Sequence, residues 1–454
     1  VFLDSLDIFR AFPLLGSGAG TFVHVYPAVR TVPGEAVFAH AHNDYVELLA
    51  TGGAVGFLLC AWFVLAVLLH VIRTLIRRRE PYSILVTSGA LTGMLALLFH
   101  CLVDFQMYNG ANGLFFFFLC GVAVAAANTR IQYRTRPTLL GKAGLTSLVA
   151  PLGIAAVLLP GSVFYSINLI RAANLSASVP PLFLNPHIPP ARLQHLHSAY
   201  SVAARLDPLE GEYPAQMGRV SMFLDSGGRA RKEFLQACLL APTSGRYLQQ
   251  LGMALTDMDA SGRQRYFLLG IQREPRNPER YLNYADWLLG TGLRQEAFAG
   301  LRQGMHAVPG RMNEFSAFLM HRRLPAAELE GMLPPLPGAW YEIGRGLEER
   351  GRRNEAAHFY IRALEHIDGA PPEPAYFSRL YRLLLRLGRD ETALQVLRRG
   401  IKELPDYAPF RNLLGDYYQG QGIIYRAREE YRQALRLQPD NRSVQRKLEQ
   451  LEGD

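Results

Sequence analysis

The feature that most constrains this 454-residue chain is a series of four long apolar segments in its first part. They cover about residues 53–72, 83–103, 111–127 and 144–167 and hold almost no charge. A membrane-spanning helix needs about 20 consecutive apolar residues, with about 17 as the lower end. Four such segments in succession exclude a single soluble domain and predict a transmembrane helix bundle over residues 46–170.

The composition changes after the last of these segments. Charged residues make up 19% of the whole chain, below the roughly 25% of a soluble protein, but from residue 192 onward Arg, Glu, Leu and Ala dominate. The net charge of +9 comes almost entirely from arginine. Because these arginines alternate with acidic residues, the charge pattern does not predict a nucleic-acid partner.

Basic residues between the apolar segments predict the orientation of the chain. One loop carries Arg73, Arg77, Arg78 and Arg79, and another carries Arg130, Arg134, Arg136 and Lys142. Loops rich in Arg and Lys lie on the cytoplasmic side of a membrane. The opposite side then holds residues 1–45, the loop around 104–112 and everything after residue 167. In a bacterium, this arrangement predicts a multi-pass inner-membrane protein with a periplasmic C-terminal part.

Small residues and prolines recur with a period of 34 in that C-terminal part. Ala393 and Ala427 are 34 positions apart, as are Pro405 and Pro439. This is the period of tetratricopeptide repeats. The expected copies are residues 211–244, 245–277, 278–311, 337–370, 374–407 and 408–441, with a half repeat at 191–206, an irregular stretch at 312–336 and a capping helix at 443–451. The expected fold is all-α, with a helix bundle, a proline-rich linker at 171–190 and a repeat solenoid over 191–454 whose concave face can hold a protein partner.

Three glycines, Gly16, Gly18 and Gly20, precede the first apolar segment. A dinucleotide-binding loop needs a strand before such glycines and a helix after them, whereas here Pro13 precedes and Pro27 follows. We therefore expect these glycines to form a tight backbone turn at the membrane surface.

Polar residues crowd the start of the first apolar segment at His40, His42, Asn43, Asp44 and Glu47. Polar groups at the mouth of a membrane helix are costly and tend to be functional. Two histidines at positions i and i+2 do not share a helix face. A zinc site that also uses Asp44 and Glu47 is an open alternative.

The sequence motifs of this stretch resemble those of a known protein family. The segment PLLGSGAGTF, a following Tyr and Arg, and then HAHNDYVELLATGGAVGF resemble the O-antigen ligase and polymerase family of bacterial membrane glycosyltransferases. Residues 100–119, HCLVDFQMYNGANGLFFFFL, resemble the next segment of that family, and some members carry a periplasmic tetratricopeptide tail. Members have further membrane helices before this region, so we expect this chain to be the C-terminal part of a longer protein.

The resemblance implies transfer of a glycan from an undecaprenyl diphosphate carrier to a lipid, glycan or protein acceptor, within membrane lipids and without a metal or cofactor. It implies His42 and Arg30 as catalytic residues. A histidine with a pKa near ~6.5 can take a proton from an acceptor hydroxyl, and an arginine presents a planar fork to diphosphate oxygens. The remaining candidates, for substrate binding, are His40, Asn43, Asp44, Glu47 and Asp104.

Two alternatives stay open at this stage. Asp104 lies four positions after His100, so the two side chains can meet along one helix face, either in a site or as a packing pair. The whole chain can also be a membrane-anchored repeat scaffold for polysaccharide assembly that catalyses nothing itself.

Overall fold

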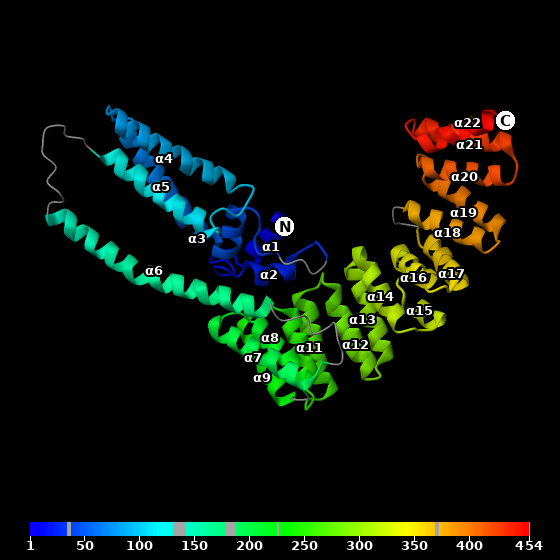
Figure 1. The fold of residues 1–454 in the computed structure, drawn as a ribbon, viewed down its shortest axis with the longest axis horizontal. Helices are drawn as coiled ribbons and strands as arrows, with labels where there is room; N and C mark the ends of the chain where they lie inside the picture. The colour runs from blue at the N-terminus through cyan, green and yellow to red at the C-terminus, as the bar shows by residue number, and fades with distance from the viewer. Residues whose placement is uncertain (34–37, 130–141, 178–187, 225–226, 368–371, 454) are drawn as a thin grey trace. The chain divides into compact units, whose positions relative to one another are not determined.

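The computed structural model describes residues 1–33, 38–129, 142–177, 188–224, 227–367 and 372–453. The chain divides into two compact units, Val1–Tyr284 and Ala285–Asp454. Every regular element in the described ranges is a helix, as Figure 1 shows, so the predicted all-α class is confirmed.

The first unit begins with six helices. They are α1 (Phe2–Ala11), α2 (Phe22–Val29), α3 (Asp44–Leu75), α4 (Pro81–His100), α5 (Gly110–Asn128) and α6 (Lys142–Ala177). Among the described residues, α3, α4 and α5 are long and apolar enough to cross a membrane, which gives three candidate spans instead of the expected four. The fourth expected span, 144–167, lies inside α6 and stays a prediction.

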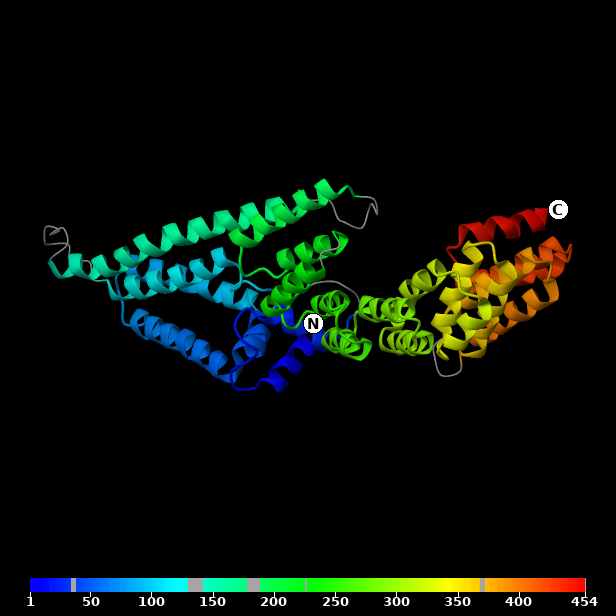
Figure 2. The same ribbon diagram turned by 90° about the horizontal axis from the view of Figure 1, so that it is seen from below.

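Helices α4 and α5 pack closely along one another, as both ribbon views show (Figures 1 and 2), and α3 contacts each of them. Their shared apolar core is formed by Val71, Ala90, Met94, Phe116, Cys120 and Ala123. At one end of the bundle, Arg78 Nε donates a hydrogen bond to the carbonyl of Ala127, and Ser83 Oγ donates one to the carbonyl of Ala126. The donor–acceptor distance is 2.6 Å in both bonds. These bonds satisfy carbonyls that the last turn of α5 leaves without a helical partner.

At the other end of the bundle, α3 is broken at Gly53, which has φ 63° and ψ −170°. Four backbone hydrogen bonds close the break, donated by Ser17, Gly18, Ala54 and Val55 to the carbonyls of Ala50, Thr51, Pro13 and Leu14, respectively, over 2.9–3.1 Å. The loop therefore satisfies the helix ends that the break exposes. Its three glycines, Gly16, Gly18 and Gly20, all have positive φ, which confirms the predicted tight turn.

Helix α6 continues beyond the fourth expected span. It ends at Ala177, so the first part of the stretch expected as a linker, 171–190, is helical, whereas 178–187 lies outside the described residues. Near its end, Ala172 is fully buried in a cluster with Tyr200, Ala203 and Tyr213. The last turns of α6 thus form part of the packing of the first repeat helices.

The repeat array follows as successive helical hairpins. Its helices are α7 (Pro190–Leu206), α8 (Glu212–Phe223), α9 (Gly227–Leu240), α10 (Gly245–Ala254), α11 (Ala260–Arg273), α12 (Pro278–Gly290), α13 (Arg294–Ala307), α14 (Met312–His321), α15 (Ala326–Met332), α16 (Pro337–Glu349), α17 (Arg353–Glu365), α18 (Pro374–Arg386), α19 (Asp390–Glu403), α20 (Ala408–Gly420), α21 (Ile424–Leu437) and α22 (Arg442–Gly453), with a short 3-10 helix at Pro309–Arg311. Each of the six expected copies holds two consecutive helices, and the expected irregular stretch holds the short helices α14 and α15.

Small residues lie where the helices of a hairpin cross. Ala427 and Ala434 of α21 are buried, as the repeat pattern predicts. A Cβ added to Gly415 of α20 would lie 2.5 Å from the ring of Tyr431. Close crossing therefore depends on small residues at these positions.

Candidate functional site

His42 lies immediately before α3 and has a backbone conformation that is unusual for its residue type. Its φ is 55°, and a left-handed conformation at a non-glycine residue costs on the order of 1 kcal/mol. Asn43 caps α3 through its side-chain oxygen, which accepts from the N–H groups of Tyr45 and Val46 at 3.1 and 3.0 Å. The capped helix start thus holds His42 in a strained position with its side chain 54% exposed.

Asp104, in the α4–α5 loop, faces His42. Its Oδ1 is 3.4 Å from His42 Nδ1, an ion-pair distance but a long hydrogen bond. The N–H of Phe105 donates to the carboxylate and, together with His42, lowers the pKa of Asp104. Asp104 and His100 are joined through their backbones and not through the side-chain pair considered from the sequence. The Asp104 N–H donates to the carbonyl of His100 at 3.2 Å.

His40 is held in an internal contact with Glu47. The two atoms His40 Nδ1 and Glu47 Oε1 are 2.9 Å apart, and the other carboxylate oxygen accepts from the N–H of Ala41 at 2.8 Å. Glu47 is 1% exposed, and the imidazole of His40 stacks on Phe105 with ring centres 4.5 Å apart. Both residues therefore fix the loop that carries His42.

Asn43 and Asp44 tie the start of α3 to the α4–α5 loop. Asn43 Nδ2 donates to the carbonyl of Leu102 at 2.7 Å. The Asp44 N–H donates to Cys101 O at 3.0 Å, and its Oδ2 accepts from the Met107 N–H at 2.9 Å. The other oxygen, Asp44 Oδ1, is also buried.

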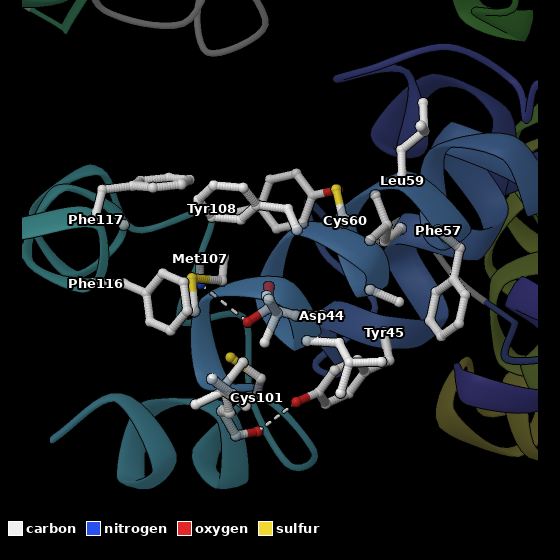
Figure 3. Close-up of a pocket in the computed structure, with 18 residues that line it drawn as sticks. Asp44, Tyr45, Phe57, Leu59, Cys60, Cys101, Met107, Tyr108, Phe116 and Phe117 are labelled. Carbon is white, nitrogen blue, oxygen red and sulfur yellow. Dashed lines mark hydrogen bonds between the residues drawn. The ribbon is translucent and has the colours of Figure 1, made fainter. Parts of the chain in front are cut away.

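Below this polar cluster runs an apolar groove of about 680 Å³ between α3 and α5, shown in Figure 3. Asp44 and Tyr108 lie among its lining residues, whose other members include Phe57, Val64 and Phe116. One wall is fixed by Tyr45, whose hydroxyl donates to the carbonyl of Leu98 at 2.7 Å. The groove thus has apolar walls, with a carboxylate near the polar cluster.

Arg30 ends α2 in buried surroundings. It is 5% exposed, and its N–H donates to Tyr26 O at 3.0 Å. The hydroxyl of Tyr26 donates to buried Asp4 at 2.8 Å, and Thr31 donates to the same carboxylate through its N–H and its hydroxyl. Burial alone would raise the pKa of Asp4, but these hydrogen bonds lower it. Sequence reasoning missed Asp4, because its partners lie 22 and 27 positions away.

The structure brings six of the seven candidate residues to one end of the bundle. They are His40, His42, Asn43, Asp44, Glu47 and Asp104, and the seventh, Arg30, lies at the end of α2. The connection between the two parts is Ala41, which is buried in the same apolar cluster as Tyr26. In the described ranges, no three His, Cys, Asp or Glu side chains form a group able to hold a metal ion.

Three apolar spans, a polar cluster at their end and an array of helical hairpins define a membrane protein with a repeat domain. Residues 2–61 match the model of the O-antigen ligase family, and residues 408–441 match that of the tetratricopeptide repeat. The resemblance seen in the sequence is thereby confirmed. The chain thus combines candidate membrane spans and a segment similar to the O-antigen ligase family with a tetratricopeptide repeat.

No curated protein matches the chain significantly. Among solved structures, it is similar to the APC/C hetero-tetramer Cut9–Hcn1, at 14% identity over 59% of this chain and 49% of that chain, with a TM-score of 0.26. It is also similar to MamA, at 18% identity over 39% and 90% of the two chains, with a TM-score of 0.24. A third is YrrB, described as a TPR protein with an unusual peptide-binding site, at 15% identity over 45% and 86%, with a TM-score of 0.24. The chain spans about half the length of the first of these, and scores this low carry no argument about function.

Proposed function

We propose that the protein transfers a glycan from a polyprenyl diphosphate carrier to an acceptor hydroxyl, in the manner of an O-antigen ligase or a polysaccharide polymerase. The observation that carries the proposal is the strained and exposed His42, which lies inside the matched family segment and pairs with Asp104 of the α4–α5 loop. Backbone strain at an exposed, chemically capable side chain is typical of functional sites.

Asp104 gives His42 a defined role in this reaction. Because an ionised Asp104 accepts a hydrogen bond from Nδ1–H, the neutral imidazole keeps its lone pair on Nε2. Nε2 takes the proton of the acceptor hydroxyl while that oxygen forms a bond to the anomeric carbon of the glycan. The bond from this carbon to the diphosphate breaks, and its electron pair leaves with the diphosphate.

Arg30 is the proposed partner of the leaving diphosphate. A guanidinium stays charged and donates in a planar fork, so it stabilises the charge that develops on the leaving group. Since Arg30 is 5% exposed, its side chain must become accessible for the diphosphate to bind. The apolar groove between α3 and α5 suits the hydrocarbon chain of the carrier, because its walls are almost entirely apolar.

The test is glycan transfer in membranes that contain the full protein. His42→Ala and Arg30→Ala should each abolish transfer at unchanged expression, and Arg30→Lys should also fail, because an ammonium lacks the fork. His24→Ala is the matched control, because it removes a different exposed histidine, which lies on α2, and it should retain transfer. Full transfer in His42→Ala would refute the proposal and favour the non-catalytic scaffold. Loss of transfer on adding a chelator, with recovery on adding zinc, would favour a metal-dependent reaction instead.

The proposed location is a bacterial inner membrane, with the polar cluster and the repeats on the periplasmic side. Arg73, Arg77 and Arg79 gather at the opposite end of α3, which supports this orientation. In a variant without its natural cysteines, Gly110→Cys should react with an impermeant thiol reagent in cells with a permeabilised outer membrane. Arg77→Cys, which is also exposed, should stay unlabelled. Labelling at position 77 alone would reverse the orientation.

A further inference from the structure

The turn between α14 and α15 differs from the turns of neighbouring hairpins. In four of those turns the residue with a left-handed backbone is glycine: Gly292, Gly351, Gly388 and Gly422, with φ between 70° and 84°. In the α14–α15 turn this residue is Arg323, with φ 51°. A side chain destabilises this conformation relative to glycine. The chain therefore keeps an arginine where its own repeats use glycine.

Arg323 lines a cavity of about 340 Å³ beside this turn. The lining residues are Leu319, Met320, Arg323, Leu324, Arg350 and Arg352. Leu319, Met320 and Leu324 are buried and form an apolar floor. All three polar lining residues are arginines, and none of the six is acidic.

The three arginines differ in how their charges are balanced. Arg352 forms a bidentate ion pair with Glu355, with N···O distances of 2.7 and 2.5 Å. The carboxylate neutralises the charge of Arg352 and holds its side chain in place. Arg350 donates to a backbone carbonyl, that of Gly346, at 3.3 Å. In the described part of the chain, no carboxylate pairs with Arg323 or Arg350. Two positive charges therefore border the cavity, with no acidic partner among the residues that the structure describes.

We propose that this cavity binds an oxyanion, a phosphate or carboxylate group, carried by a ligand of about monosaccharide size. Guanidinium groups match such oxyanions in geometry and charge. The apolar floor suits the carbon face of a sugar ring, and the volume is at the lower end of the range for ligand pockets, about 300–1,000 Å³. The proposal stands independently of glycan transfer, since it uses none of the residues around His42.

Calorimetric titration of the detergent-solubilised full chain tests the proposal. The probes are inorganic phosphate, glucuronate and glucose, and we expect one or both anions to bind while neutral glucose does not. Binding of phosphate alone would identify a phosphate ligand, and binding of glucuronate alone a carboxylated sugar. Failure of both anions, or equal binding of glucose, would overturn the proposal.

Variants of the turn sharpen the test, because they separate binding from stability. Arg323→Gly should weaken anion binding about tenfold through loss of a charge-assisted contact. It should also raise the Tm of the repeat array by about 2–4 °C, because the strain of a left-handed arginine is removed. Arg350→Ala should weaken binding to a similar extent without raising the Tm.

Arg436→Ala is the matched control, because it removes one exposed arginine on α21 that does not line the cavity. Its anion affinity should equal that of the unmodified chain. Unchanged affinity in both Arg323→Gly and Arg350→Ala would contradict the proposed site, and so would an equal loss of affinity in the control.

Discussion

Two regions of the molecule depend on glycine for close approach, and they differ in what the glycine meets. At the break in α3, a Cβ added to Gly53 would lie 2.3 Å from the carbonyl oxygen of Leu14, a backbone atom. At the crossing of α20 and α21, a Cβ added to Gly415 would meet the ring of Tyr431 at 2.5 Å. A side chain can rotate or shift, whereas a hydrogen-bonded backbone cannot. The first region should therefore tolerate substitution less than the second.

The largest effect is expected for Gly53→Ala. The alanine would need a positive φ and would press against the backbone of the 13–18 loop, so we expect a loss of about 3 kcal/mol or more in the free energy of unfolding of the bundle. Thermal unfolding of the detergent-solubilised chain measures this loss. Gly56→Ala, three residues further along α3 and with open space around its Cα, is the matched control and should unfold almost normally. Equal unfolding of the two variants would show that the break in α3 does not require a glycine at position 53.

A smaller effect is expected in the repeat array. Ala434→Phe should destabilise the array by about 1–3 kcal/mol through overpacking where the helices cross. The bundle should stay folded, because each repeat contacts mainly its neighbours. Gly420→Ala, at the exposed end of α20 with no atom near the added Cβ, should not destabilise the array. An unchanged melting profile for Ala434→Phe would contradict the repeat register.

The same difference explains what the sequence predicted. The repeat hairpins and the apolar spans follow from local periodicity, and the span expected from residue 53 begins where α3 is broken. The contacts of the 13–18 loop were not predictable, because backbone hydrogen bonds between segments more than 30 positions apart leave no periodic pattern. The pairing of His42 with Asp104 was missed for a similar reason, since 62 positions separate them. The candidate residues were predictable from the sequence. Which of them form contacts within the protein, as His40 and Glu47 do, was not.

Glu47→Gln probes one of these contacts, with an effect of intermediate size. With its oxygen on the Ala41 N–H, the amide can offer His40 Nδ1 only a donor, so it loses the charge of the buried carboxylate and cannot accept from Nδ1–H. We expect a loss of about 1–2 kcal/mol in the free energy of unfolding of the bundle. Transfer should fall as well, because the loop that carries His42 loses its anchor. Normal thermal stability in this variant would show that Glu47 does not hold the loop.

Asp104→Asn should give the smallest change in stability and still a clear loss of activity. The side chain is 39% exposed, and substitution of an exposed partner in such a pair changes the free energy of unfolding little. Asparagine lacks the charge that holds Nδ1–H of His42, so transfer should fall about tenfold or more as the base loses its preferred tautomer. Measuring transfer and unfolding on the same preparations separates the two effects. Glu47→Gln should lower both quantities, whereas Asp104→Asn should lower transfer alone. If Asp104→Asn destabilised the bundle as much as Glu47→Gln, Asp104 would have a structural role. That outcome would contradict the proposed role of the His42–Asp104 pair in the reaction.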